Sequence, residues 1–184
     1  MPERPDPEPA DSLAESVRRA RHGSADALAA LYATYADQVL GTAYRILGNR
    51  ADAEDTLQDL FVGMPEALTH YREEGKFGAW LRRLAARTAL MRLRRQRHEA
   101  SFADGIDPPA REVAGTGALD RVAVADALAR LPEQLRQVFL LKEVEGFTHQ
   151  EIGDLLGISP GASGVRLHRA WRSLRTLLGT TEDR

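Results

Sequence analysis

The 184-residue sequence contains no cysteine, which excludes disulfide bonds and thiolate metal sites. It also lacks a run of about 18 apolar residues, the length that a membrane-spanning helix needs. Residues 1–9 (Met-Pro-Glu-Arg-Pro-Asp-Pro-Glu-Pro) are polar and proline-rich and lack the apolar segment of a signal peptide. We therefore expect a cytoplasmic protein in which residues 1–11 form a disordered tail.

Side-chain groupings typical of enzymes are also missing. No glycine-rich segment carries the lysine of a phosphate-binding loop. The histidines lack the spacing of metal ligands, being scattered as His22, His70, His98, His149 and His168. The sequence predicts no enzyme activity, no metal site and no cofactor.

What the sequence does contain favours an all-α fold. Long segments rich in Ala, Leu, Arg and Glu separate a few clusters of glycine and proline, and apolar residues recur at steps of three and four. Pro65 lies inside one such pattern, over residues 51–68, and should kink or divide that helix. We predict two small helical domains, residues 12–98 and 119–179, joined by a flexible linker over residues 99–118, where a Pro-Pro pair and three glycines occur.

The net charge of −2 hides a strong segregation of charge. Residues 75–98 contain eight basic side chains and no acid, and residues 161–178 contain four arginines and no acid. Acids concentrate instead in residues 52–74 and 120–154. Two separate acid-free helices indicate two contacts with a polyanion.

Residues 147–160 have the order of parts of a helix-turn-helix. Thr148 and Glu151 form a capping box at the start of a short helix. Gly157 stands where a helix commonly ends in a left-handed residue, and Ser159 with Pro160 restarts a helix. The second helix of such a unit can lie in the DNA major groove.

Three patches together resemble the extracytoplasmic-function group of bacterial RNA polymerase sigma factors. They are residues 52–61, residues 75–84 continuing to 93–95, and residues 131–139 with 146–152. The resemblance implies a region 2 that binds the polymerase clamp coiled coil and opens the −10 element, and a region 4 that reads the −35 element as duplex. The implied partners are core RNA polymerase, promoter DNA and an anti-sigma factor.

The resemblance also implies roles for individual residues. The polymerase-binding residues would be Asp52, Glu54, Asp55, Gln58, Asp59 and Phe61. The −10 contacts would be Tyr71, Lys76, Arg82, Arg83, Arg87, Arg92, Arg94 and Arg95. The −35 contacts would be Ser159, Ala162, Arg166 and Arg169, of which Arg166 is the best candidate for a base edge because arginine pairs bidentately with guanine.

Two aromatic side chains are candidates to stack on an unpaired −10 base. Trp80 recurs with Leu84 at a helical spacing, which favours core packing. Tyr71 lies in the predicted loop before the basic helix and is therefore the better candidate.

Several positions depart from what this family commonly carries: Pro65, Arg87, Met91 and the run Ala162-Ser163-Gly164-Val165, where the family commonly has Thr-Val-Lys-Ser. Ser163 places a hydroxyl where an apolar side chain usually packs, and Gly164 weakens a helix by about 1 kcal/mol relative to alanine. These departures bear on promoter preference and leave the charge layout intact.

Two other classes of protein remain open from the sequence. A stand-alone helix-turn-helix regulator would bind a palindromic duplex as a dimer. It would use residues 131–178 and leave the acidic and first basic helices without a role. A helical adaptor would bind proteins alone and have no affinity for DNA.

Overall fold

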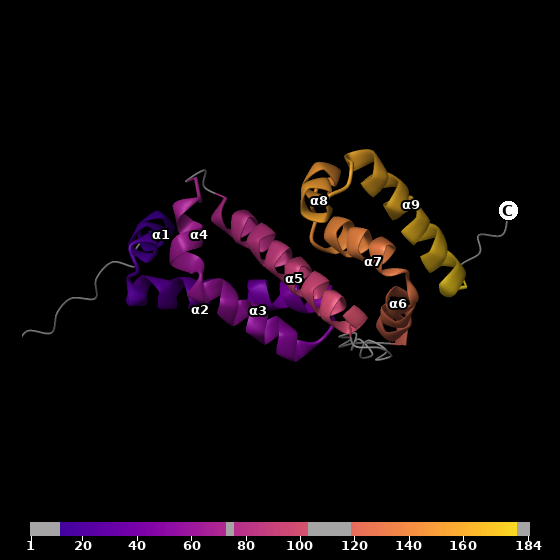
Figure 1. The fold of residues 1–184 in the computed structure, drawn as a ribbon, viewed down its shortest axis with the longest axis horizontal. Coiled ribbons are helices and arrows are strands. Elements are labelled where there is room, and N and C mark those ends of the chain that lie inside the picture. The colour runs from indigo at the N-terminus through magenta and orange to yellow at the C-terminus, as the bar shows by residue number, and fades with distance from the viewer. Residues whose placement is uncertain (1–11, 73–75, 103–118, 180–184) are drawn as a thin grey trace, which may run out of the picture.

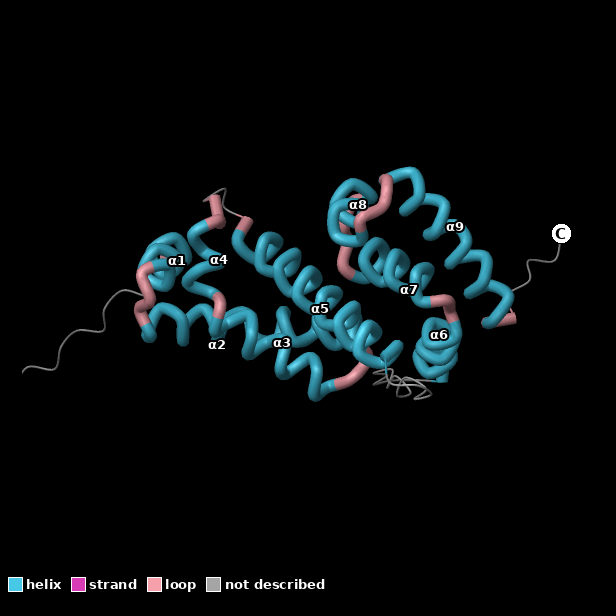
Figure 2. The backbone as a smooth tube through the Cα atoms, in the orientation of Figure 1, coloured by secondary structure: helices cyan, strands magenta, loops and turns pink. Residues whose placement is uncertain are grey.

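The computed structural model describes residues 12–72, 76–102 and 119–179, and helices make up almost all of this part of the chain (Figure 1). Figure 2 shows helices and loops and no strand in these residues. The predicted all-α fold is therefore confirmed. The predicted tail, residues 1–11, and residues 103–118 of the predicted linker lie outside the described residues.

The described part of the first domain contains the helices α1 (Leu13–Arg21), α2 (Ala25–Leu47), α3 (Arg50–Val62), α4 (Met64–Thr69) and α5 (Phe77–Phe102). Serine hydroxyls cap α1 and α2, at Ser12 and Ser24, and the left-handed Gly48 ends α2. Buried side chains such as Leu31, Met64 and Leu81 form its core. The long helices α2, α3 and α5 pack on one another and position the acidic and basic surfaces.

Two boundaries in this domain follow from local chemistry. Pro65 divides the helical pattern as predicted, because α3 ends at Val62 and α4 begins at Met64 with the proline in its first turn. At the other end, α5 continues to Phe102, so residues 99–102, predicted to belong to the linker, extend the basic helix.

The second domain contains α6 (Leu119–Arg130), α7 (Glu133–Phe139), the π-helix η1 (Leu140–Val144), α8 (His149–Leu156) and α9 (Pro160–Leu177). The helix that begins after Pro132 changes from α-helix to π-helix at Leu140. Leu131, Phe139, Ala170 and Leu174 pack together between α6, α7 and α9.

The two domains touch, and α8 lies beside α5 (Figure 1). One cluster of buried side chains combines Ile46, Leu90 and Leu93 of the first domain with Leu141 and other residues of the second. Helix α9 lies on the side of α7 that is away from α5 (Figure 1). No helix in the described ranges has the length and apolarity to cross a bilayer.

Candidate polymerase and nucleic-acid interfaces

The acids predicted to bind polymerase lie on α3, where Asp52 is partly buried and the others are exposed. Asn49 caps α3 by accepting a hydrogen bond from the Asp52 backbone N–H at 2.8 Å. The Asp52 side chain turns toward α5 and is mostly buried, whereas Glu54, Asp55, Gln58 and Asp59 are exposed. The exposed fraction of the Asp59 side chain is 67%. The outward surface of α3 is therefore acidic over two turns.

Arg92 of α5 connects this helix to the rest of the domain. Its guanidinium lies 3.1 Å from Asp52, 2.5 Å from Asp55 and 3.4 Å from Asp59. Its side chain is only 16% exposed. The sequence places Arg92 among the −10 contacts, but in the structure it is the counter-ion of the acidic helix.

The ionisation of Asp52 reflects this arrangement. Burial raises the pKa of its carboxyl, but hydrogen bonds from Asn49, Gln96 and Arg92 and the positive charge of Arg92 more than offset that effect. The pKa of Asp52 therefore lies below its usual value. Asp52 remains a carboxylate that holds α3 against α5.

Apolar side chains continue the exposed surface of α3 at its C-terminal end. Phe61 is partly buried and meets the exposed ring of Tyr32 edge to face, with centroids 4.9 Å apart. Val62 is 82% exposed. The sequence predicts Phe61 as a polymerase contact but not Val62. Val62 is exposed because α3 ends at this residue, and the position of that end was not known from the sequence.

The aromatic residues before and within α5 pack into the core. Tyr71 is 9% exposed, and its ring lies 5.4 Å from Phe77 and 5.0 Å from Trp80. The expectation that the Tyr71 ring lies open in a loop is not met, because these aromatic neighbours enclose it. Trp80 packs partly buried against the core, as its spacing predicts. Lys76 is exposed, and residues 73–75 of the predicted loop before the basic helix lie outside the described residues.

Three arginines of α5 reach the second domain. Arg82 lies over the ring of Phe147, 5.6 Å from its centroid. Arg83 donates to Glu151 at 2.9 Å, and Arg94 donates to the backbone carbonyl of Leu155 at 3.0 Å. The predicted −10 surface is thus partly covered by α8 and the segment before it.

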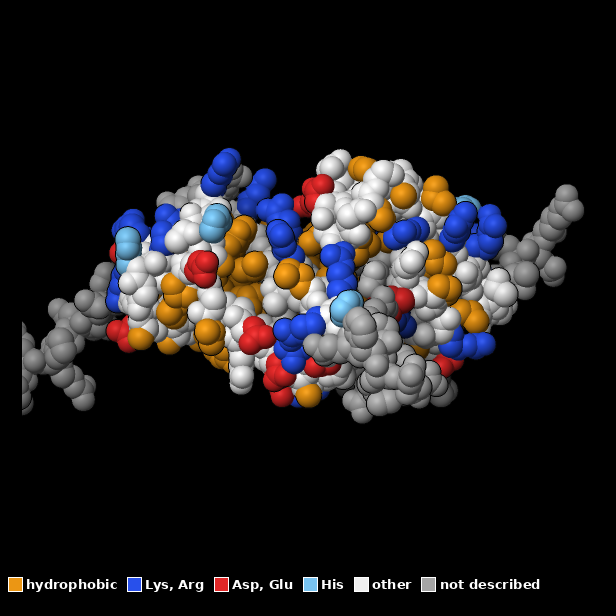
Figure 3. All heavy atoms as spheres, viewed as in Figure 1, with side chains coloured by type: hydrophobic (Ala, Val, Ile, Leu, Met, Phe, Trp, Pro, Cys, Tyr) orange, Lys and Arg blue, Asp and Glu red, His pale blue; other side chains and the backbone are white. Residues whose placement is uncertain are grey.

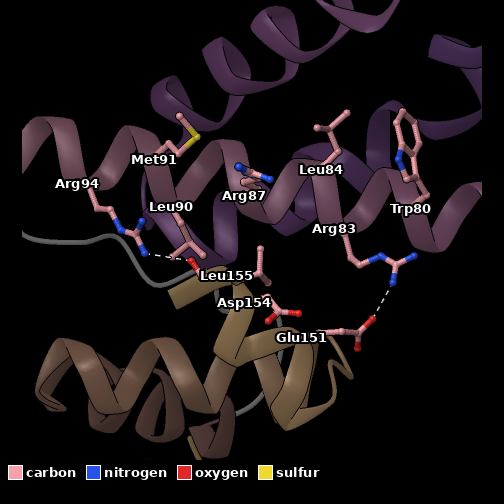
Figure 4. A pocket seen from close by; sticks show the side chains of 10 residues that line it. All are labelled: Trp80, Arg83, Leu84, Arg87, Leu90, Met91, Arg94, Glu151, Asp154 and Leu155. Atoms are coloured by element: carbon pink, nitrogen blue, oxygen red, sulfur yellow. Dashed lines mark hydrogen bonds and ion pairs between the residues drawn. The ribbon is translucent and has the colours of Figure 1, made fainter. Parts of the chain in front are cut away.

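Arg87 and Arg95 are exposed on the same helix. Figure 4 shows Arg83 and Arg94 extending from α5 toward α8, with Arg87 between them. These side chains line a cavity of about 550 Å³ whose apolar lining includes Leu84, Leu90 and Leu155. Basic side chains gather along the junction of the two domains (Figure 3).

The helix-turn-helix forms as predicted. Thr148 and Glu151 make both hydrogen bonds of a capping box, and Gly157 adopts φ 68° at the end of α8. The Thr148 backbone N–H lowers the pKa of Glu151 most, burial raises it, and the Thr148 hydroxyl and Arg83 lower it further. Glu151 is therefore a carboxylate that caps α8 through one oxygen and binds Arg83 through the other.

The buried hydroxyl of Ser163 has a partner that the sequence did not reveal. Ser163 is fully buried, and its Oγ lies 2.9 Å from Nδ1 of His149. This hydrogen bond joins α9 to the first turn of α8. The departure at this position is thereby accommodated without an orphaned polar group.

The predicted −35 residues extend from the N-cap of α9 to the middle of that helix. The Ser159 hydroxyl accepts a hydrogen bond from the Ala162 N–H and caps the helix. Ala162 and Arg166 are partly exposed, Arg169 is exposed, and Val165 between them is 53% exposed. The sequence did not select Val165 as a contact, although it is an exposed apolar side chain next to Arg166.

Glu145 is a second residue that sequence reasoning missed. It follows η1, is 3% exposed, and accepts hydrogen bonds from Thr42 and Arg45 of α2. Its partners are about a hundred residues away, so no local pattern could reveal them. No group of three or more histidines and acids in the described ranges could hold a metal ion.

Both halves of the chain match family models. The Sigma-70 region 2 model matches residues 31–99, and the Sigma-70 region 4 model matches residues 121–174. RNA polymerase sigma factor CarQ of Myxococcus xanthus is 38% identical over 169 residues, which cover 90% of this chain and 97% of CarQ. ECF RNA polymerase sigma factor SigW of Bacillus subtilis is 28% identical, covering 90% of this chain and 96% of SigW.

Solved structures share the fold. The sigma factor RpoE of Bartonella quintana, in complex with the anti-sigma factor NepR, superposes with a TM-score of 0.65 at 22% identity, covering 83% of this chain and 96% of RpoE. CnrH, in complex with the cytosolic domain of CnrY, superposes with a TM-score of 0.58 at 25% identity, covering 91% and 97%. With two sigma domains in order and a relative matched almost end to end, the chain belongs to the extracytoplasmic-function group of bacterial RNA polymerase sigma factors.

Proposed function

We propose that this promoter-specificity subunit divides its work among three helices: α3 binds core RNA polymerase, α5 binds the −10 element, and α9 binds the −35 duplex. The observation that carries the proposal is the separation of charge: the exposed acids of α3 and the acid-free α9 lie in different domains. The chain has no catalytic role in this scheme. Because it acts with RNA polymerase on the chromosome, the proposal places it in the cytoplasm.

The α3 surface suits a basic helical partner, which the family resemblance identifies as the clamp coiled coil. Glu54, Asp55 and Asp59 supply negative charge that steers a cationic partner toward the helix. Val62 and the Tyr32–Phe61 pair supply apolar contact area at one end. Interfaces of this kind depend on a few desolvated apolar anchors surrounded by charge.

The two basic helices suit different forms of DNA. The arginines of α5 other than Arg92, together with Lys76 just before the helix, would follow the phosphates of a separated strand. Tyr71 would need to leave its core position to stack on a base. On α9, Arg166 would contact a base edge, while Arg169 and the helix N-terminus at Ser159 would approach phosphates.

An anti-sigma factor is the proposed regulator. The solved relatives RpoE and CnrH are each described in complex with a partner protein, NepR in the first case and the cytosolic domain of CnrY in the second. A regulator that covers α3 or α5 would prevent polymerase or DNA binding without altering the fold.

Reconstituted transcription tests the proposal. The purified chain, core RNA polymerase and a pool of genomic promoter fragments are combined, and initiated transcripts are sequenced. Transcripts that require both proteins, and whose start sites share two spaced sequence elements, support the proposal. Tight dimeric binding to duplex DNA without polymerase, and no polymerase-dependent transcript, would instead indicate a stand-alone regulator.

A further inference from the structure

Apolar side chains from both domains are buried together where the two domains meet. Val138, Leu141, Phe147 and Ile152 of the second domain are buried in the cluster that also contains Leu90 of α5. Burial of such side chains is the main favourable term in association. The two domains of this chain therefore hold each other through a closed apolar contact.

A buried carboxylate lies at one edge of this contact. Glu145 Oε2 accepts from the Thr42 hydroxyl at 2.9 Å, and Glu145 Oε1 lies 2.5 Å from Nε of Arg45. An ionised group is costly to bury unless it is paired and hydrogen-bonded, and both of these partners belong to the other domain. If the domains separate, Glu145 regains water, so its pairing depends on closure.

The π-helix places Glu145 in this position. The Glu145 backbone N–H bonds to the carbonyl of Leu140, five residues earlier, which is the π-helical pattern. Such bulges are uncommon and are frequently found at functional sites. Here the widened turn directs the end of η1 toward α2.

The same closure occupies cations that the proposed function assigns to DNA. Arg82, Arg83 and Arg94 all contact the second domain. The contact is imperfect for one of them, because Nε of Arg82 is buried and has no hydrogen-bond acceptor among the described residues. Release from the second domain would let Arg82 regain a full set of partners, which favours a reversible contact.

We propose that the second domain is an intramolecular competitor of nucleic acid for α5, and that Glu145, seated on Thr42 and Arg45, is the latch of this closed form. Opening separates Glu145 from α2 and frees Arg82, Arg83 and Arg94 from their second-domain partners. The competition with DNA rests on the proposed −10 role of α5, whereas the latch itself does not. The apparent DNA affinity of the chain is then its intrinsic affinity reduced to the open fraction.

The experiment compares two latch variants whose charge changes are opposite. Glu145→Gln removes an anion and Arg45→Gln removes a cation, yet each breaks the same ion pair. Glu143→Gln, at an exposed acid of the same π-helix, is the control with the charge change of Glu145→Gln. Helical content and thermal unfolding of each full-length variant confirm that it is folded.

Closure is measured by energy transfer between dyes. The chain has no cysteine, so cysteines introduced at the exposed Glu66 of α4 and Thr176 of α9 are unique labelling sites. Both latch variants should show a larger fraction of low-transfer molecules than the unchanged chain and the control. Transfer that is equal in all four proteins would overturn the latch, and the transcription result would be unaffected.

Competition is measured by binding of a random-sequence single-stranded oligonucleotide. Both latch variants should bind more tightly, by the factor by which their open fraction rises. Their salt dependence should also be steeper by up to about 2, since three released cations contribute roughly 0.7 each on single strands. Weaker binding by Arg45→Gln, or opening without a gain in affinity, would overturn the competition.

Discussion

Arg92 of α5 donates from Nε to Asp52 of α3 at 3.1 Å, and its other two nitrogens reach Asp55 and Asp59. One cation from the basic helix thus orders three acids of the acidic helix. The two surfaces that the sequence separates by charge are joined at this residue. Arg92 therefore acts within the protein, holding α3 in place for whatever binds its outer face.

Replacement of Arg92 should lower the free energy of unfolding by more than it lowers the free energy of DNA binding. Arg92→Met leaves Asp52 mostly buried without its cation, and the loss of a charged partner costs about 1–3 kcal/mol of unfolding free energy. Urea denaturation measures the change. Arg87→Met is the matched control, because Arg87 is exposed on the same helix. Equal stability of the two variants would show that the Arg92 contacts contribute nothing to the fold.

The outer face of α3 gives a prediction for polymerase binding. Val62→Glu should weaken binding of core RNA polymerase while leaving stability unchanged, because Val62 is almost fully exposed and a charge there would have to be desolvated in the complex. Asp59→Arg should weaken binding through reversed charge. Pull-down with purified core enzyme measures both variants.

The control for these two variants lies in the other domain. Asp126→Arg on α6 makes the same charge change as Asp59→Arg at an exposed acid. It should bind polymerase like the unchanged chain. If all three variants bound equally well, α3 would not be the polymerase-binding surface.

The helix-turn-helix contains two glycines for which opposite results are expected. A Cβ at Gly153 would lie 2.7 Å from the backbone carbonyl of Ile158, so Gly153→Ala must displace the turn between α8 and α9. A Cβ at Gly164 would meet nothing within 4 Å. Gly164→Ala should therefore raise the unfolding free energy by up to about 1 kcal/mol, from helix propensity alone.

Thermal unfolding tests this pair of glycine variants. Gly164→Ala should raise Tm and Gly153→Ala should lower it. If Gly164→Ala lowered Tm instead, helix propensity would not be the factor that decides stability at this position.

The capping carboxylate predicts a dependence of stability on pH. The pKa of Glu151 is lowered in the folded chain from its ordinary value of 4.5, so its contribution to stability is fully present above that value and is lost as pH falls through the folded pKa. The free energy of unfolding should therefore decrease below about pH 4. Asp52, whose pKa is also lowered, contributes in the same direction.

Glu151→Gln isolates the contribution of the Glu151 charge to the free energy of unfolding. Glutamine can make the hydrogen bond of a capping box without the charge. The variant should be less stable than the unchanged chain near neutral pH, and the difference should shrink as the pH falls below 4. A difference that is constant with pH would show that the carboxylate charge has no part in it.

The sequence predicts those features of the fold and the site whose interacting residues are close together in the chain. The capping box at Thr148 and Glu151, the left-handed Gly157 and the division at Pro65 depend on neighbours within about one turn, and all are confirmed. The burial of Tyr71 depends on how the end of α4 meets α5. Its place in a loop suggested the opposite.

The interdomain contacts required the folded chain. Thr42 and Glu145 are 103 residues apart, and nothing in either local pattern indicates their hydrogen bond. A buried acid at the end of an apolar helix looks in the sequence like an ordinary surface acid. The structure also assigns Arg82, Arg83 and Arg94 to an internal contact, because charge segregation alone does not say which polar group a cation meets.

The exposed face of α9 gives a prediction about base discrimination. Arg166→Ala should reduce affinity for the −35 duplex and relax discrimination by about 1–3 kcal/mol if its guanidinium pairs with a guanine. Competition between the recovered −35 sequence and single-base variants measures the loss. Arg175→Ala, in the last turn of α9, should weaken binding uniformly across these sequences if it meets phosphate.

Val165 provides a complementary test of the proposed −35 contact. Its exposed side chain cannot form a hydrogen bond, and the thymine methyl is the apolar group that a base pair presents in the major groove. Replacing thymine by uracil at one −35 position should then weaken binding by the unchanged chain by about 0.8 kcal/mol, the contribution of one buried methyl-sized group. The same replacement of thymine by uracil should leave the affinity of the Val165→Ala variant unchanged. If the unchanged chain binds with the same affinity when uracil replaces thymine at each −35 position, Val165 makes no contact with a thymine methyl.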